Sequence, residues 1–180
     1  MRKYSIIYAD PPWSYNDKAS AGKRGVCFKY SVLDTESVCA LPIADLAAEN
    51  CTLFMWATFP MLPDAFRVMQ AWGFKYKTVA FVWVKTNKKV DTDFFGMGNW
   101  TRANAEIVLL GIKGKPKRVS ASVRQVVRVP IARHSEKPNE VRQRIVELMG
   151  NTPRIELFAR EKIDGWDVWG NEVESDIHMR

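Results

Sequence analysis

Apolar residues occur along this chain in short continuous runs, separated by polar segments that contain glycine or proline. Runs of this length that end at turn residues are typical of strands buried on both faces of a sheet. The pattern predicts strands at residues 5–10, 51–58, 78–85, 105–112, 122–131 and 155–159.

Helical spacing is found between some of these runs. Residues 61–72 predict a helix that ends at Gly73, and residues 138–149 predict a second one that begins at a proline and ends before Gly150. A shorter helix is expected over about 35–48, interrupted near Pro42. The polar segment 14–35 predicts a long loop of the kind that often acts as a lid.

Strands alternate with helices early and late in the chain, and a hairpin-like pair of strands around a basic turn lies between them. This order predicts a single α/β domain over residues 1–180, built around a mostly parallel sheet of about seven or eight strands. Ligands of such sheets bind at the carboxyl ends of the strands. Asp10 follows the first predicted strand and Arg160 follows the last, so both are candidate site residues.

Composition narrows the class of protein. Hydrophobic residues make up 47% of the chain, which is enough for a core, and no apolar run approaches the length of about 20 residues that a membrane span needs. The apolar run near the N-terminus is too short for a signal peptide, so we expect a cytoplasmic protein without a membrane partner. The 3 cysteines form no Cys-x-x-Cys pair, and we expect no metal site.

The net charge of +7 favours a polyanionic partner without specifying a sequence. Cations without any acidic residue cluster between residues 113 and 133, where Lys115, Lys117 and Arg118 are candidate nucleic-acid contacts. A solvated loop explains this cluster equally well.

Asp10-Pro11-Pro12-Trp13 is the most informative short motif. An aromatic amine is a poor nucleophile because its lone pair is delocalised into the ring. A carboxylate and a proline-fixed carbonyl can each accept one of the amine's N–H groups, and an aromatic ring can hold the base by stacking. By itself, however, the motif is also compatible with an ordinary turn beside a core tryptophan.

The whole chain resembles the Asp-Pro-Pro-Trp family of adenine-N6 methyltransferases, which includes the catalytic subunit of the eukaryotic messenger-RNA methylating complex and many bacterial and phage enzymes. Besides the first motif, the resemblance rests on blocks in the family's order. These are residues 71–74 (AWGF), 83–87 (WVKTN), 98–100 (GNW), Glu106 with 111–114 (GIKG), 134–140 (HSEKPNE), 155–160 (IELFAR), 165–166 (GW) and 170–172 (GNE).

The resemblance implies a Rossmann-like fold with permuted motif order and S-adenosylmethionine as the methyl donor. It implies that Asp10 and the Pro11 carbonyl hold the target amine, that Trp13 lines the pocket beside Pro12, and that Tyr30 lies near the substrate. The cofactor residues that it implies, in addition to Asp10, are Lys137, Phe158, Arg160, Gly170, Asn171 and Glu172.

Simpler roles remain for several of these residues. Phe158 fits a core position, and Lys137, Arg160 and Glu172 fit surface or helix-flanking charges. Lys85 and Arg102 are candidate substrate contacts that fit solvated loops equally well, and Trp72, Trp83 and Trp169 are better explained by packing. The glycine-rich cofactor loop of many methyltransferases is absent, since Ala159 and Arg160 follow Phe158.

The compact chain is most similar in build to bacterial or phage members, which favours DNA as the substrate and leaves RNA as the alternative. A homodimer or a partner subunit is a possible source of target recognition. An inactive nucleic-acid-binding subunit is a weaker hypothesis, because Asp10, Lys137 and Asn171 are all present. A methyltransferase of small molecules or proteins is disfavoured by the basic stretch.

Overall fold

The computed structural model describes residues 2–13, 33–132 and 136–179. Its centre is a seven-stranded sheet in the order β5-β3-β4-β2-β1-β6-β7. The strands are β1 (Tyr4–Ala9), β2 (Ala47–Ala57), β3 (Lys75–Thr86), β4 (Ala105–Lys113), β5 (Val126–Pro130), β6 (Arg154–Leu157) and β7 (Asp167–Trp169).

Within this sheet β4 runs antiparallel to both of its neighbours, and every other pairing is parallel. The carboxyl ends of the other strands therefore meet at one edge together with the first residues of β4. The mostly parallel α/β sheet expected from the sequence is confirmed. The first and last predicted strands are direct neighbours, because Ala9 of β1 lies opposite Leu157 of β6.

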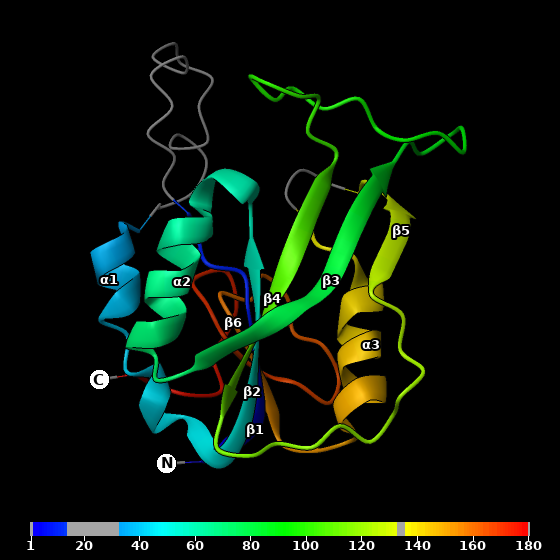
Figure 1. Ribbon diagram of the computed structural model, residues 1–180. Coiled ribbons are helices and arrows are strands. Elements are labelled where there is room, and N and C mark those ends of the chain that lie inside the picture. The colour runs from blue at the N-terminus through cyan, green and yellow to red at the C-terminus, as the bar shows by residue number, and fades with distance from the viewer. Residues whose placement is uncertain (1, 14–32, 133–135, 180) are drawn as a thin grey trace.

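Helices cover both faces of the sheet (Figure 1). α1 (Thr35–Cys39) and α2 (Leu62–Ala71) lie on one face, and α3 (Asn139–Met149) lies on the other. Two apolar clusters fill the two interfaces; Leu53 and Met69 belong to the first, and Phe54 and Ile145 belong to the second. Neighbouring residues of β2 enter opposite clusters because successive side chains of a strand point to opposite faces.

Several predicted boundaries were wrong. The helix expected over 35–48 is limited to α1 and a 3-10 turn, Ile43–Asp45, because Pro42 interrupts it and Ala47 already belongs to β2. The predicted hairpin does not form. β5 is separated from β4 by β3 and pairs parallel with β3, because residues 114–125 pass by the end of β3 and reach its outer side. Strand β7 was not predicted at all.

Among the described residues, no helix is both long and apolar enough to cross a membrane. These residues also contain no cluster of histidine, cysteine and carboxylate side chains that could hold a metal ion.

Candidate active site

The Asp10-Pro11-Pro12-Trp13 segment leaves β1 as a constrained turn at the carboxyl edge of the sheet. The backbone N–H of Asp10 donates to the carbonyl of Leu157 at 3.5 Å, and the Trp13 N–H donates to the Pro11 carbonyl at 2.9 Å. The Trp13 indole is buried, and its Nε1 donates to the carbonyl of Trp56 at 3.1 Å. The turn is therefore fixed at both ends, while the Pro11 oxygen keeps a second lone pair for another donor.

Asp10 belongs to a row of alternating charges that crosses the sheet edge. The Lys137 ammonium lies 3.6 Å from Oδ1 of Asp10 and 2.8 Å from Oε2 of Glu106. The Lys85 ammonium lies 2.8 Å from the other Glu106 oxygen. We call these four side chains the charge row. Their exposed fractions lie between 14% and 25%, so the row is largely shielded from water but remains accessible.

The topology explains why these residues meet. Asp10 follows β1, Lys85 is near the end of β3, and Lys137 precedes α3. Glu106 is the second residue of β4, and it reaches the same edge only because β4 is antiparallel to its neighbours.

Two tryptophans support the lysines of the charge row. The Lys137 ammonium lies 5.3 Å from the ring centroid of Trp56, and the Lys85 ammonium lies 5.1 Å from that of Trp83. The Trp56 indole is fixed in turn, because its Nε1 donates to the Tyr8 hydroxyl at 2.5 Å. Cation–π contacts at such partly desolvated sites stabilise a lysine by about 0.5–2 kcal/mol. Both rings are buried, which confirms packing as the structural role of Trp83.

Burial and charge act differently on the two carboxyl groups. Burial raises the pKa of Asp10 above the ordinary aspartate value, and the nearby Lys137 ammonium offsets this only in part. Burial also acts to raise the pKa of Glu106, but there Lys137 and Lys85 together outweigh it and lower the pKa. The two carboxyl groups of the charge row are therefore shifted in opposite directions from their ordinary values.

A second group of predicted residues lies at the ends of β6 and β7, beside Asp10. Phe158 follows β6 with a φ of 59°, a left-handed conformation that bulky residues rarely adopt. Its half-buried ring packs edge-on against Trp169, with a centroid separation of 5.4 Å. Gly170 allows the two strand ends to approach closely, because a Cβ atom there would lie 2.2 Å from the Ala159 carbonyl oxygen.

The polar residues beyond these strand ends are exposed. Arg160 lies 3.8 Å from the Glu172 carboxylate, measured from Nε to Oε1. Asn171 and Glu172 lie in the turn after β7, and the Ser175 hydroxyl accepts a hydrogen bond from the Gly170 N–H at 3.1 Å. A cation, an amide and a carboxylate are thus available next to the charge row.

Other predicted contacts lie elsewhere. Lys115, Lys117 and Arg118 follow the carboxyl end of antiparallel β4, so they lie at the opposite edge of the sheet from Asp10. There the Lys115 N–H donates to the Asn50 side chain at 2.7 Å. These three cations therefore do not line the same site as Asp10, and their role as nucleic-acid contacts stays a prediction. Arg102 lies in the loop between β3 and β4, and Tyr30 lies outside the described residues.

Glu106 is the residue that sequence reasoning missed as part of the site, although it occurs in the motif blocks. Its signal was available, because it is a lone acidic residue that begins a long apolar strand. Such a charge is rarely buried unless it is paired.

Comparison with known proteins agrees with this geometry. The family pattern described as MT-A70 matches residues 4–172, which include every member of the charge row. The chain belongs to the MT-A70 family. Members of this family are adenine-N6 methyltransferases with a Rossmann-like fold, so the chain is an enzyme of this class, and S-adenosylmethionine is the methyl donor that the family implies.

Individual relatives agree with the family assignment. The chain is 36% identical to a Type II methyltransferase, M.MunI, from Mycoplasma sp, over 96% of this chain and 78% of that protein. It is 27% identical to the human N(6)-adenosine-methyltransferase catalytic subunit METTL3, over 99% of this chain. It is 25% identical to an MT-A70-like N(6)-adenosine-methyltransferase from Arabidopsis thaliana. The chain spans 30% and 24% of the length of these two eukaryotic relatives.

Proposed function

We propose that this protein transfers a methyl group from S-adenosylmethionine to the N6 amine of adenine in DNA, with Asp10 at the reacting centre. The observation that carries the proposal is the placement of Asp10. Its partly buried carboxylate emerges from a constrained turn directly after β1, within ion-pair distance of Lys137. The adjoining ends of β6 and β7 supply the other polar groups that a methyl donor of this kind requires.

The turn can make the adenine amine nucleophilic. The Asp10 carboxylate accepts a hydrogen bond from one N–H group, and the free lone pair of the Pro11 carbonyl accepts one from the other. Both bonds draw the nitrogen away from planarity, so that its lone pair points out of the ring. Pro12 keeps the turn rigid, and the buried Trp13 fixes its position through the hydrogen bond to Trp56. Preorganised polar groups of this kind are commonly the largest contribution to catalysis.

The residues at this edge fit the cofactor by charge and by donor type. The charge row sums to zero, with Asp10 and Glu106 balanced by Lys85 and Lys137. It therefore accommodates a zwitterionic amino acid group, whose carboxylate would pair with Lys137 and whose ammonium would pair with Asp10. Asn171 and Glu172 would bind the ribose hydroxyls, with Gly170 holding their turn close to β6. Phe158 and Arg160 would line the adenosine portion.

When bound, the cofactor supplies an electrophilic methyl group on a sulfonium. The amine that received this methyl group would lose one proton, and the cofactor would be left as a neutral thioether. The Asp10 carboxylate faces that proton and accepts it. The raised pKa of Asp10 suits a proton acceptor better than that of an ordinary surface aspartate would. The chain contributes orientation and electrostatics.

DNA is the substrate that the relatives support better. The alignment covers most of the length of the Type II methyltransferase, but less than a third of the length of the N(6)-adenosine-methyltransferases. RNA is the second candidate, because the N(6)-adenosine-methyltransferases align with nearly the whole of this chain, at lower identity.

One experiment separates these substrates. The protein is incubated with methyl-labelled S-adenosylmethionine and with matched DNA and RNA oligomers, single-stranded and duplex, and the digested nucleosides are identified by mass spectrometry. We expect labelled N6-methyldeoxyadenosine. Label only in RNA would replace the DNA assignment, and label on a base other than adenine, or on no nucleic acid, would contradict the proposed reaction.

A further inference from the structure

The loop between β3 and β4 carries a group of exposed apolar side chains. Phe95, Met97 and Trp100 are 73%, 93% and 100% exposed, which makes them the three most exposed large hydrophobic residues in the part of the chain that the structure describes. We call these three residues the apolar tip. Exposed apolar residues that cluster in this way often mark a binding surface.

Local packing holds the apolar tip outward. A Cβ atom at Gly96 would lie 1.6 Å from the Ala103 carbonyl oxygen, and one at Gly98 would lie 2.1 Å from that of Thr101. The two glycines therefore let the outgoing and returning backbone of the loop come together. Arg102 braces the turn, because its guanidinium lies 5.3 Å from the Phe95 ring centroid and donates to the Gly98 carbonyl at 3.4 Å. The exposed positions of Phe95, Met97 and Trp100 therefore result from the way in which the loop packs against itself.

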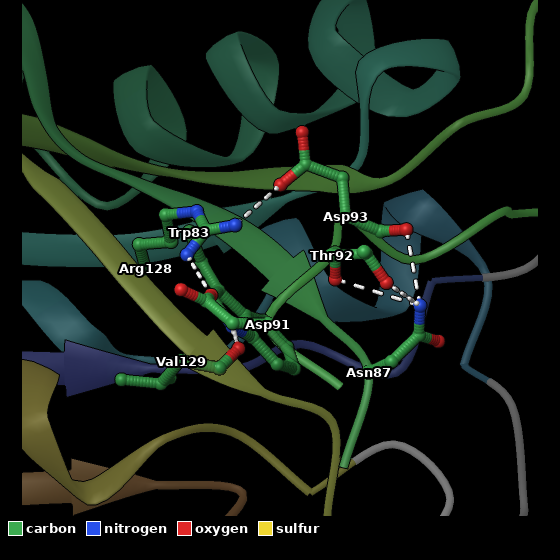
Figure 2. Close-up of polar contacts among 7 residues, drawn as sticks. All are labelled: Trp83, Asn87, Asp91, Thr92, Asp93, Arg128 and Val129. Atoms are coloured by element: carbon green, nitrogen blue, oxygen red, sulfur yellow. Dashed lines mark hydrogen bonds and ion pairs between the residues drawn. The ribbon is translucent and has the colours of Figure 1, made fainter. Parts of the chain in front are cut away.

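The first half of the loop is tied to β5, the outermost strand on this side of the sheet (Figure 2). Arg128 of β5 forms ion pairs with Asp91 and Asp93, the second at 3.2 Å. The Asn87 side-chain amide donates to the Thr92 hydroxyl at 2.8 Å. The first half of the loop is therefore anchored to β5, and the apolar tip lies in the half that follows.

The loop starts and ends at the charge row. Lys85 and Glu106 lie on its two sides in sequence, and they form an ion pair at 2.8 Å. The backbone N–H of Lys85 also donates to the Asn104 carbonyl at 2.8 Å, which closes the base of the loop. From this base the loop projects beyond the ends of β3 and β4, at the edge of the sheet where Asp10 lies (Figure 1).

The charges of the loop select the partner. Residues 94–104 include Arg102 and no acidic residue, and Lys88 and Lys89 add two exposed cations. The two aspartates of the loop are matched by Arg128. Aromatic rings combined with cations and free of acidic residues are suited to nucleic acid, whose bases stack on the rings while its phosphates meet the cations.

We propose that Phe95 and Trp100 of the apolar tip stack on the bases that flank the target adenine. This inference rests on the proposed function and adds a substrate-positioning surface to it. An adenine in a duplex must leave its stack before its amine can reach Asp10, and an apolar side chain inserted beside the vacated position offsets part of that cost. The tip projects from the same edge as Asp10, and the loop behind it is anchored to β5 by the ion pairs of Arg128.

Alanine substitutions test the stacking. Trp100→Ala and Phe95→Ala are each expected to weaken the binding of a labelled oligodeoxynucleotide by about five-fold or more. S-adenosylmethionine affinity and thermal stability should stay at the wild-type level. Phe66→Ala is the matched control, because Phe66 is also an exposed aromatic residue but lies on α2 against Tyr76, with a centroid separation of 4.9 Å. Its oligodeoxynucleotide affinity should not change.

Photocrosslinking tests the contact itself. Oligodeoxynucleotides that carry iodouracil next to an adenine are irradiated with the wild-type protein, and crosslinked peptides are identified by mass spectrometry. We expect crosslinks in the peptide that contains Phe95 and Trp100. If the wild-type protein methylates DNA but Trp100→Ala and Phe95→Ala bind the oligomer normally, or change only the oligomeric state, the inference is wrong while the proposed function stands. Absence of any adenine methylation by the wild-type protein would instead overturn the proposed function.

Discussion

The two edges of the sheet both contain many charged residues, yet they are built differently. At the Asp10 edge, four charges from different parts of the chain form one row, lie within ion-pair distance of one another and are mostly shielded from water. At the opposite edge, the basic segment 113–118 follows β4, and Lys115, Lys117 and Arg118 are exposed. Contacts there tie the segment to the loop before β2, as in the hydrogen bond that Lys113 donates to the Ala44 carbonyl at 3.2 Å.

This difference shows that cation density along the sequence is a poor guide to the reacting centre. The basic segment is the more conspicuous feature of the sequence, but its charges lie along one stretch of chain in water, where they interact weakly. The charge row draws one residue from each of four distant segments. Its electrostatic influence on a substrate is larger because its surroundings exclude water.

Removing Lys137 should have the largest effect on cofactor affinity among the substitutions that compare the two edges. Lys137→Met deletes the ammonium shared by Asp10 and Glu106, and we expect S-adenosylmethionine to bind about 10- to 100-fold more weakly. Isothermal titration calorimetry measures this change. Lys85→Met is the matched control, since Lys85 lies at the same 2.8 Å from Glu106 but has no ion pair with Asp10 among those described. Equal losses in the two variants would show that the contact with Asp10 is unimportant.

Acid should inhibit methyl transfer before it unfolds the protein. Because the folded-state pKa of Asp10 is raised, its carboxylate becomes protonated at a pH above the usual aspartate range, and it can then no longer accept the amine hydrogen. Protonation of Asp10 itself favours the folded state, whereas the stability that the lowered pKa of Glu106 contributes is lost as the pH falls below the ordinary glutamate range. Single-turnover rates and circular dichroism are measured across the same pH series. The rate should be lost at a higher pH than the folded structure. Coincident loss of rate and structure would contradict this order.

Asn171→Ala, at the same edge as Asp10, should lower S-adenosylmethionine affinity less than Lys137→Met does. The loss of one exposed amide hydrogen bond is expected to weaken the binding of S-adenosylmethionine by about three- to ten-fold. Calorimetry against the wild-type protein measures it, and Asn151→Ala, which lies near the opposite ends of the strands, serves as the control. An unchanged dissociation constant for Asn171→Ala would move the ribose site away from the turn after β7.

Substitutions in the basic segment should have the smallest effect on methylation. Glu106 and Lys113 are seven residue steps apart along β4, a distance of about 23 Å along an extended strand and well beyond the screening length of about 8–10 Å. Replacing Lys115, Lys117 and Arg118 together with glutamine should change the methylation of a short oligodeoxynucleotide by less than about two-fold. A large loss on a short substrate would place nucleic acid across both edges.

Much of the fold followed from local pattern, because buried strands and the two longer helices are encoded by adjacent residues. The placement of Asp10 and Arg160 at the carboxyl ends of strands also followed, since parallel strands share that edge, but the direct pairing of β1 with β6 did not. The position of β5 could not be predicted, because a basic turn between two apolar runs is equally compatible with a hairpin and with a crossover. Glu106 was missed for a similar reason, since the antiparallel direction of β4 that carries it to Asp10 is a property of the whole sheet.

The most direct test of the account compares Asp10→Asn with the wild-type protein in one preparation, measuring single-turnover methylation of DNA, S-adenosylmethionine affinity and thermal stability. Asparagine keeps the shape of the side chain but removes the charge that accepts the amine hydrogen. The account predicts a rate loss of about 10²–10³-fold or more, cofactor affinity within about one order of magnitude, and stability that is not reduced. An Asp10→Asn protein that methylates adenine at nearly the wild-type rate would contradict it.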